Sequence, residues 1–139
     1  MRGAIALPAE VDAKMTGSGQ RIAAAGALLA ALGIALGAFG AHALKNVLDA
    51  QQLDWWHNGC QYQLWNAVGL VALGALPRRL GLAAILLGLV TILFAGSLYA
   101  MALTGQRGLG MVTPVGGVLM IAGWLLAAWR LARPNSASR

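Results

Sequence analysis

The sequence is poor in charged residues, and in acidic residues above all. Only four of its 139 residues are aspartate or glutamate, against ten lysines and arginines, and charged residues make up 10% of the chain. A soluble domain of this length needs far more charge to cover its surface. Hydrophobic residues make up 59% of the chain instead, and the mean hydropathy is +0.70. These values exclude an ordinary soluble domain and predict a membrane protein.

Cysteine and the common catalytic motifs are also scarce. Cys60 is the only cysteine, so no disulfide can form within the chain. A zinc or copper site needs at least three ligands, and the spacing offers only His57 and Cys60 as a close pair, with His42 on another segment. The chain has no paired carboxylates, Ser-His-Asp pattern, phosphate-binding glycine loop or dinucleotide fingerprint. We therefore expect no metal, no cofactor and no enzymatic activity.

Four long apolar runs dominate the rest of the chain. The first, residues 22–44, would be about 34 Å long as a helix, enough to cross a hydrocarbon core of about 30 Å. Pro77 and the two arginines after it end the second run, and Thr113-Pro114 is typical of an N-cap followed by a first-turn proline. The sequence predicts an all-α, polytopic membrane protein with a compact bundle of four transmembrane helices within residues 21–133. The expected spans are residues 22–44, 54–76, 80–103 and 113–131.

The basic residues predict the orientation of the chain. Four crossings place both termini and the connection between the second and third spans on one side of the membrane. That side holds eight of the ten basic residues: Arg2, Lys14, Arg21, Arg78, Arg79, Arg130, Arg133 and Arg139. The positive-inside rule then predicts cytoplasmic tails at residues 1–20 and 134–139. Contact with lipid headgroups accounts for the net charge of +6, so we expect no nucleic-acid partner.

Small residues recur at intervals of three and four in the first and third spans. Lipid is as apolar as leucine, so transmembrane helices associate through small residues that allow close approach of their backbones. The regular spacing argues against a simple excess of glycine and alanine. The predicted packing positions are Gly26, Gly33, Gly37 and Gly40 in the first span, with Gly81, Gly88 and Ala95 in the third.

A few polar side chains lie within the predicted spans, where they are costly unless paired. Three of them recur every four residues on the second span, a glutamine lies beside these three, and the others lie towards the ends of neighbouring spans. We expect them to converge near the non-cytoplasmic side, as a cluster of His42, Asn58, Tyr62, Gln63, Asn66, Tyr99 and Thr113. Two interpretations stay open. The cluster either locks the helices in register or forms a small pocket for a headgroup, an ion or a metabolite.

The five tryptophans fall towards the ends of the predicted spans. They are Trp55, Trp56, Trp65, Trp124 and Trp129. Tryptophan is enriched at the interface between membrane and water, which favours an interfacial belt. The same rings can also serve as packing residues between helices.

Four motifs follow one another in the chain: Gly37-Ala-Phe-Gly-Ala-His42, Tyr62-Gln63, Gly96-Ser-Leu-Tyr99 and Thr113-Pro-Val-Gly-Gly117. In order and spacing they resemble the YgdD-like small bacterial inner-membrane proteins, a family also described as domain of unknown function 423, to which the eukaryotic transmembrane protein 256 is related. The resemblance covers about residues 26–131. It implies a compact four-helix protein of the bacterial inner membrane and carries over no biochemical activity. Family members often place a histidine where this chain has Asn66, so a mechanism with one histidine from each of the first two spans is not implied.

These features together predict a non-enzymatic integral membrane protein with a structural or assembly role. Its expected partners are the lipid bilayer and either other membrane proteins or further copies of itself. The alternative is a small transporter-like or ligand-binding membrane subunit that uses the polar cluster. Four short helices leave little room for alternating access, so this alternative needs a dimer.

Overall fold

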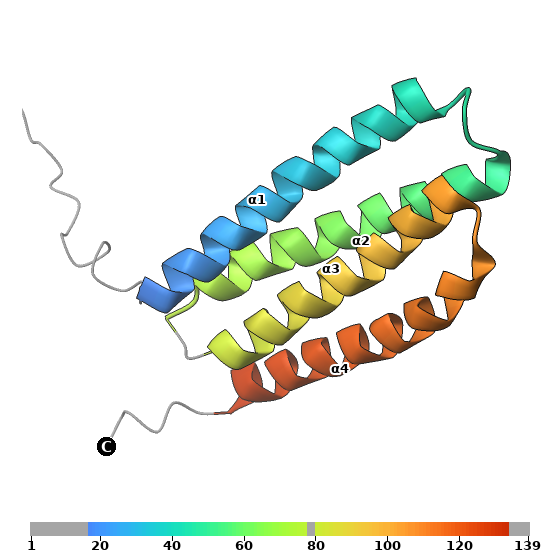
Figure 1. Cartoon of the computed structure of the whole chain (residues 1–139). Coiled ribbons are helices and arrows are strands. Elements are labelled where there is room, and N and C mark those ends of the chain that lie inside the picture. Colours follow the sequence, from blue (N-terminus) through green and yellow to red (C-terminus); the bar gives the residue numbers. More distant parts are fainter. Residues whose placement is uncertain (1–16, 78–79, 134–139) are drawn as a thin grey trace, which may run out of the picture.

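The computed structural model describes residues 17–77 and 80–133, which form four long helices with short connections. Successive helices run in opposite directions (Figure 1). The predicted all-α fold is confirmed. The elements are α1 (Gly17–Phe39), the π-helical turn η1 (Gly40–Leu44), α2 (Ala50–Ala75), α3 (Gly81–Thr104), the 3-10 turn η2 (Arg107–Met111) and α4 (Val112–Ala132). Residues 1–16 of the expected N-terminal tail, Arg78, Arg79 and the expected tail 134–139 lie outside the described residues.

Two helices begin earlier than the apolar runs predict. Residues 17–20, expected in the tail, belong to α1, because Gly19 is buried against α2 and extends the packed length of the helix. α2 begins at Ala50 rather than at residue 54, and Asp49 is its N-cap. The Asp49 carboxylate accepts the Gln52 amide N–H at 2.8 Å, and the Gln52 side-chain oxygen accepts the Asp49 amide N–H at 3.0 Å. This capping box satisfies amides that the polar start of the helix would otherwise expose.

The prediction that Thr113 caps the fourth helix is wrong. The helix begins at Val112, directly after the 3-10 turn, and its cap residue Met111 makes no side-chain hydrogen bond. Pro114 is still tolerated, since the first turn of a helix needs no amide donors. The Thr113 hydroxyl is thereby free to contact α3.

The helices form an open row in which each packs mainly on the next in the sequence. α2 lies between α1 and α3, and α3 lies between α2 and α4. Within residues 17–77 and 80–133, no Cα of α1 comes within 8 Å of a Cα of α4. α1 and α4 are thus the two edges of the row (Figure 1). The hydrophobic core lies along the middle of the row and includes Leu70, Ala84, Leu87, Phe94 and Met120.

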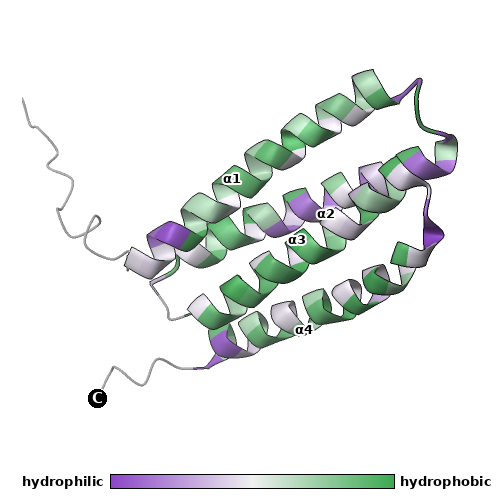
Figure 2. Ribbon diagram, in the orientation of Figure 1, coloured by the Kyte–Doolittle hydropathy of each residue, from purple (hydrophilic) through white to green (hydrophobic). Residues whose placement is uncertain are grey.

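Three helical segments are long and apolar enough to cross a membrane by length and composition: Gly17–Leu44, Gly81–Thr104 and Arg107–Ala132. α2 fails this criterion because its first half is polar, as the purple bands in Figure 2 show. It nevertheless connects the end of α1 to the start of α3, and those two helices run in the same direction (Figure 1). α2 must therefore cross the same thickness of membrane in the opposite direction. Its 26 residues span about 39 Å, which is long enough to do so.

Candidate functional site

Glycines at seven-residue intervals form the contact between α1 and α2. The buried glycines of α1 and η1 are Gly19, Gly26, Gly33 and Gly40. A period of seven keeps one narrow seam facing a partner helix along its whole length. A Cβ on Gly26 would lie 2.7 Å from the Ala67 carbonyl oxygen and 2.8 Å from the Val71 amide nitrogen. The backbones of α1 and α2 are therefore in direct contact, and this contact positions the polar side chains between the helices.

The predicted packing residues divide into two groups. Gly26, Gly33 and Gly40 face α2, and Ala95 is 2% exposed in α3. Gly88 makes only an ordinary contact, with Leu70 Cδ1 at 3.6 Å from its Cβ position. A Cβ on Gly37 or Gly81 would meet nothing within 4 Å, so neither residue supports a close helix contact.

Five close glycine contacts escape the sequence pattern. A Cβ on Gly74 would lie 2.6 Å from the Gly19 carbonyl oxygen. The other four receive large side chains from neighbouring helices: Gly59 receives Tyr99, Gly69 receives Trp124, Gly116 receives Phe94 and Gly123 receives Leu87. Spacing alone does not reveal them, because each depends on which ring or branched side chain faces it from another helix.

The predicted polar cluster is divided between separate helix contacts. Gln63 is buried at 4% exposure and joins α1 to α3. Its amide nitrogen donates to the Leu29 carbonyl oxygen at 2.9 Å, and its side-chain oxygen accepts the Tyr99 hydroxyl at 2.8 Å. Both contacts require close helices, which Gly33 permits because a Cβ there would lie 3.4 Å from the Gln63 amide nitrogen.

Asn66 lies one turn further along α2 and reaches α4 instead. Its amide nitrogen donates to the Tyr62 carbonyl oxygen at 2.8 Å and to the Met120 sulfur at 3.0 Å. Its side-chain oxygen accepts the indole N–H of Trp124 at 2.9 Å. The residue is 3% exposed, so all of its polar atoms are used in contacts within the chain.

Thr113 forms a third contact, between α3 and α4. Its hydroxyl oxygen lies 3.0 Å from that of Ser97, which in turn donates to the Phe94 carbonyl oxygen at 2.7 Å. Ser97 is absent from the predicted cluster, although it stands in the motif that ends at Tyr99. Ser97 could have been included because it is a polar residue within a predicted span and lies two residues before Tyr99.

His42 and Asn58 do not join these contacts. Both side chains are exposed, His42 in the π-helical turn and Asn58 on α2. Tyr62 is 38% exposed, and its ring packs edge-on against Phe94 with centroids 5.0 Å apart. Within the described part of the chain, no three His, Cys, Asp or Glu side chains come together as possible metal ligands.

The π-helical turn at the end of α1 has a local cause in Trp56. This residue is 3% exposed, and its indole N–H donates to the Leu36 carbonyl oxygen at 2.8 Å. In a regular helix that oxygen accepts the amide of residue 40, so an inserted side chain can widen the turn. The ring lies so close that a Cβ on Gly40 would be 2.5 Å from it. Trp56 and Trp124 are therefore packing residues, whereas Trp129 is 52% exposed and carries Arg133 stacked 3.5 Å from its ring centroid.

Two grooves open between helices that are not neighbours in the sequence. One, of about 670 Å³, lies between α1 and α3 with Leu70 at its floor. The other, of about 730 Å³, lies between α2 and α4 and is lined by Tyr62, Asn66, Phe94 and Trp124. At 100° per residue, Phe94 lies on the opposite side of α3 from Ile85 and Ile92, which line the first groove. The row is therefore grooved on both faces.

The sequence of the chain matches a known family of proteins. Residues 36–117 match the family described as protein of unknown function (DUF423). The chain belongs to the DUF423 family. It is 42% identical over 108 residues to the inner membrane protein YgdD of Escherichia coli, covering 72% of this chain and 82% of the relative. It is 41% identical over 105 residues to a UPF0382 membrane protein of Staphylococcus saprophyticus, covering 73% and 88%.

Membership of the DUF423 family agrees with the helical structure, and the chain is a multi-pass protein of the inner membrane. A UPF0382 membrane protein of Staphylococcus haemolyticus is 40% identical over 105 residues, or 73% of this chain and 86% of that relative. No solved structure matches the chain. The motifs that carried the resemblance meet across helices, since Gln63 bonds Tyr99 and Thr113 lies against Ser97.

Proposed function

We propose that this DUF423 protein is not an enzyme and has a structural or assembly role, binding a neighbouring membrane protein or a second copy through an edge of its helix row. One observation carries the proposal. The buried polar side chains Gln63, Asn66, Thr91 and Ser97 are all hydrogen-bonded to other groups of the chain. Within the described residues, no buried side-chain nitrogen or oxygen lacks a partner. Gln63, Asn66 and Ser97 join neighbouring helices, whereas Thr91 bonds within α3. The interhelical bonds favour the first interpretation of the polar cluster.

The edges of the row supply the surface for such an assembly. α1 buries only its glycine seam, and Leu28, Leu32 and Ile34 are more than half exposed. α4 packs mainly on α3, and Val118, Ile121 and Leu125 are exposed to a similar extent. Small residues and shape, rather than a difference in polarity, drive association between helices in lipid.

A photoreactive residue at Leu32 or Ile121 tests the proposal in intact membranes. We expect a cross-linked protein band from at least one of these edges, because a packed partner holds its side chains within reach of the probe. Leu87, which is 1% exposed, is the matched control and should give no band between chains. A protein that remains a single chain in nanodiscs, with lipid as its sole cross-linked product at both edges, would contradict the assembly role.

We further infer that both termini are cytoplasmic. α1 begins and α4 ends at the same end of the row, where Arg21, Arg130 and Arg133 lie (Figure 1). The opposite end has Lys45 and Arg107 among the described residues. Five more basic residues belong by sequence to the first end and lie outside the described residues: Arg2, Lys14, Arg78, Arg79 and Arg139. This asymmetry supports the cytoplasmic assignment through the positive-inside rule.

The groove between α2 and α4 favours a second candidate function, the binding of a small apolar or aromatic molecule. Tyr62, Trp65 and Trp124 give it aromatic walls, and Asn66 lies at its base. The Asn66 amide is already bonded to Trp124 and Met120, so a ligand would contact mainly ring faces. A thermal-shift screen of ions and metabolites separates the two functions, since the assembly role predicts no ion or metabolite that stabilises the protein.

A further inference from the structure

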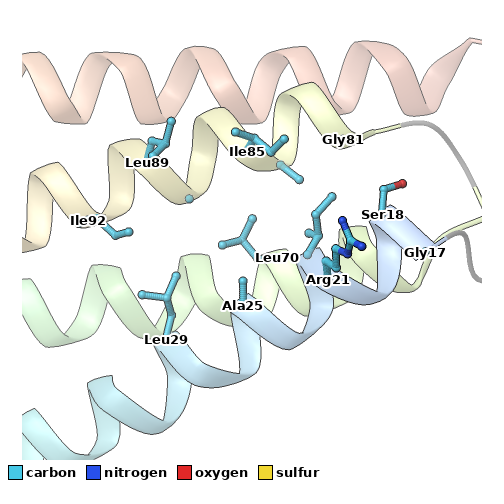
Figure 3. A pocket seen from close by; sticks show the side chains of 13 residues that line it. Gly17, Ser18, Arg21, Ala25, Leu29, Leu70, Gly81, Ile85, Leu89 and Ile92 are labelled. Carbon is cyan, nitrogen blue, oxygen red and sulfur yellow. The ribbon is translucent and has the colours of Figure 1, made fainter.

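The groove between α1 and α3 is apolar along most of its length and open at its side. Figure 3 shows Ala25 and Leu29 of α1 on one wall and Ile85 and Leu89 of α3 on the other, with Leu70 of α2 beneath. Two glycines of α3 on this side, Gly81 and Gly88, leave space in the groove. A Cβ on Gly81 would meet nothing within 4 Å, and one on Gly88 would meet only Leu70, at 3.6 Å.

The length of the groove matches one leaflet of a bilayer. Along α3 it extends from Gly81 to Ile92, which corresponds to about 16 Å at the helical rise of 1.5 Å per residue. Half of a hydrocarbon core of about 30 Å is about 15 Å. The groove therefore begins where the helices begin, at the depth of the headgroups, and ends near the middle of the membrane.

The headgroup end of the groove is positively charged. Arg21 lines it and extends between α1 and α3 in Figure 3. The acidic residues in the described part of the chain are Asp49 and Asp54, and both lie at the far end of the helices. α3 starts beside the groove with Leu80 as its N-cap, and among the described residues no side-chain cap bond satisfies its first amides. Those amides and the helix dipole add to the positive potential, which favours an anion at this position.

We propose that this groove binds an anionic glycerophospholipid from the surrounding leaflet, with one acyl chain between α1 and α3 and the phosphate on Arg21 and the first amides of α3. An acyl chain matches the apolar walls, and a phosphate matches the charge at their end. Arginine binds phosphate through parallel N–H donors, which gives the site a preference for the headgroup beyond general attraction to the membrane. The site does not depend on the assembly role, because it lies between helices of one chain.

Lipid titration of the purified full-length protein in detergent tests the site. Thermal stability is followed while phosphatidylglycerol or phosphatidylcholine with identical chains is added. We expect phosphatidylglycerol to bind about fivefold more tightly, as about 1 kcal/mol per basic group near an anionic surface implies. Arg21→Gln should remove this difference between the lipids. Gly88→Leu, which fills the groove, should weaken the binding of both.

Matched variants separate the groove from general effects. Arg133→Gln removes the same charge at the same end of the row but outside the groove, and Gly37→Leu adds the same bulk to a glycine with open space around it. Both should bind as the unmodified protein does. If Gly88→Leu fails to fold, Ala25→Leu fills the groove from the α1 wall. The proposal would be overturned if the two lipids bound equally, or if Arg133→Gln lost the preference for phosphatidylglycerol as Arg21→Gln does. It would also be overturned if glycerol phosphate without chains bound as strongly as the lipid, or if a folded groove-filling variant bound lipid as the unmodified protein does.

Discussion

Replacement of Gly26 by leucine is expected to separate α1 from α2 and to lower the free energy of unfolding by more than about 3 kcal/mol. Overpacking usually costs about 1 to 3 kcal/mol because neighbouring side chains can rotate away. Here the atoms in the way are the Ala67 carbonyl oxygen and the Val71 amide nitrogen, at 2.7 and 2.8 Å from the Cβ position. Backbone atoms in a helix cannot move without moving the helix. The shift would also pull Gln63 away from the Leu29 carbonyl.

The measurement is unfolding in mixed micelles with increasing sodium dodecyl sulfate. Gly37→Leu is the matched control, since it makes the same change in the same helix at a position with nothing within 4 Å. It should leave stability nearly unchanged, and Gly37→Ala should raise it slightly because glycine is the poorer helix former by about 1 kcal/mol. Equal stability of Gly26→Leu and Gly37→Leu would mean that backbone contact does not hold α1 to α2.

Replacement of Asn66 by leucine is expected to lower the free energy of unfolding by about 2 kcal/mol. Hydrogen bonds between transmembrane helices average about 0.6 kcal/mol and reach about 1.7 kcal/mol. Asn66 accepts the Trp124 indole N–H and donates to Met120 and Tyr62, so its loss removes the polar link between α2 and α4. The Trp124 N–H would then remain without an acceptor in an apolar environment, which adds to the cost.

Asn58→Leu provides the comparison for Asn66→Leu. The two asparagines lie on the same helix eight residues apart, but the Asn58 side chain is exposed and makes no hydrogen bond within the described residues. Its replacement should leave stability unchanged. Trp124→Phe should reproduce part of the Asn66 effect, and the double variant should lose less than the sum of the two single losses. Additive losses would show that the 2.9 Å bond contributes little.

The all-α fold and the number of helices follow from the apolar runs, because only a helix satisfies its own backbone in lipid. Gly26, Gly33 and Gly40 could be predicted because their spacing of seven keeps them on one seam. Gly37 lies four residues after Gly33 and three before Gly40, so it falls at the border of that seam. In α3, Gly81 and Gly88 form an equally regular stripe that lines a groove. A stripe of small residues shows where another helix can approach closely. It does not show that a helix packs there.

The polar contacts were harder to predict from the sequence than the helices. Asn58, Tyr62 and Asn66 are spaced by four, which suggests one polar face. Gln63 and Asn66 are only about 60° apart around α2, yet one reaches α1 and α3 and the other reaches α4. α2 lies inside an open row, so side chains on adjacent parts of its surface face different helices. Their partners depend on the arrangement of all four helices, which periodicity within one helix does not contain.

Cysteine labelling along α2 is the most direct test of the claim that all four helices cross the membrane with the termini in the cytoplasm. In a Cys60→Ala background, single cysteines replace Gln51, Val68 and Ala75, which are exposed at the start, in the second half and at the end of α2. With a thiol reagent that cannot cross the membrane, we predict labelling at Gln51→Cys in spheroplasts and at Ala75→Cys only after the membrane is opened. Val68→Cys should stay unlabelled in both. Labelling of Gln51→Cys and Ala75→Cys from the same side would contradict the crossing of α2, and labelling of Ala75→Cys alone in spheroplasts would reverse the orientation.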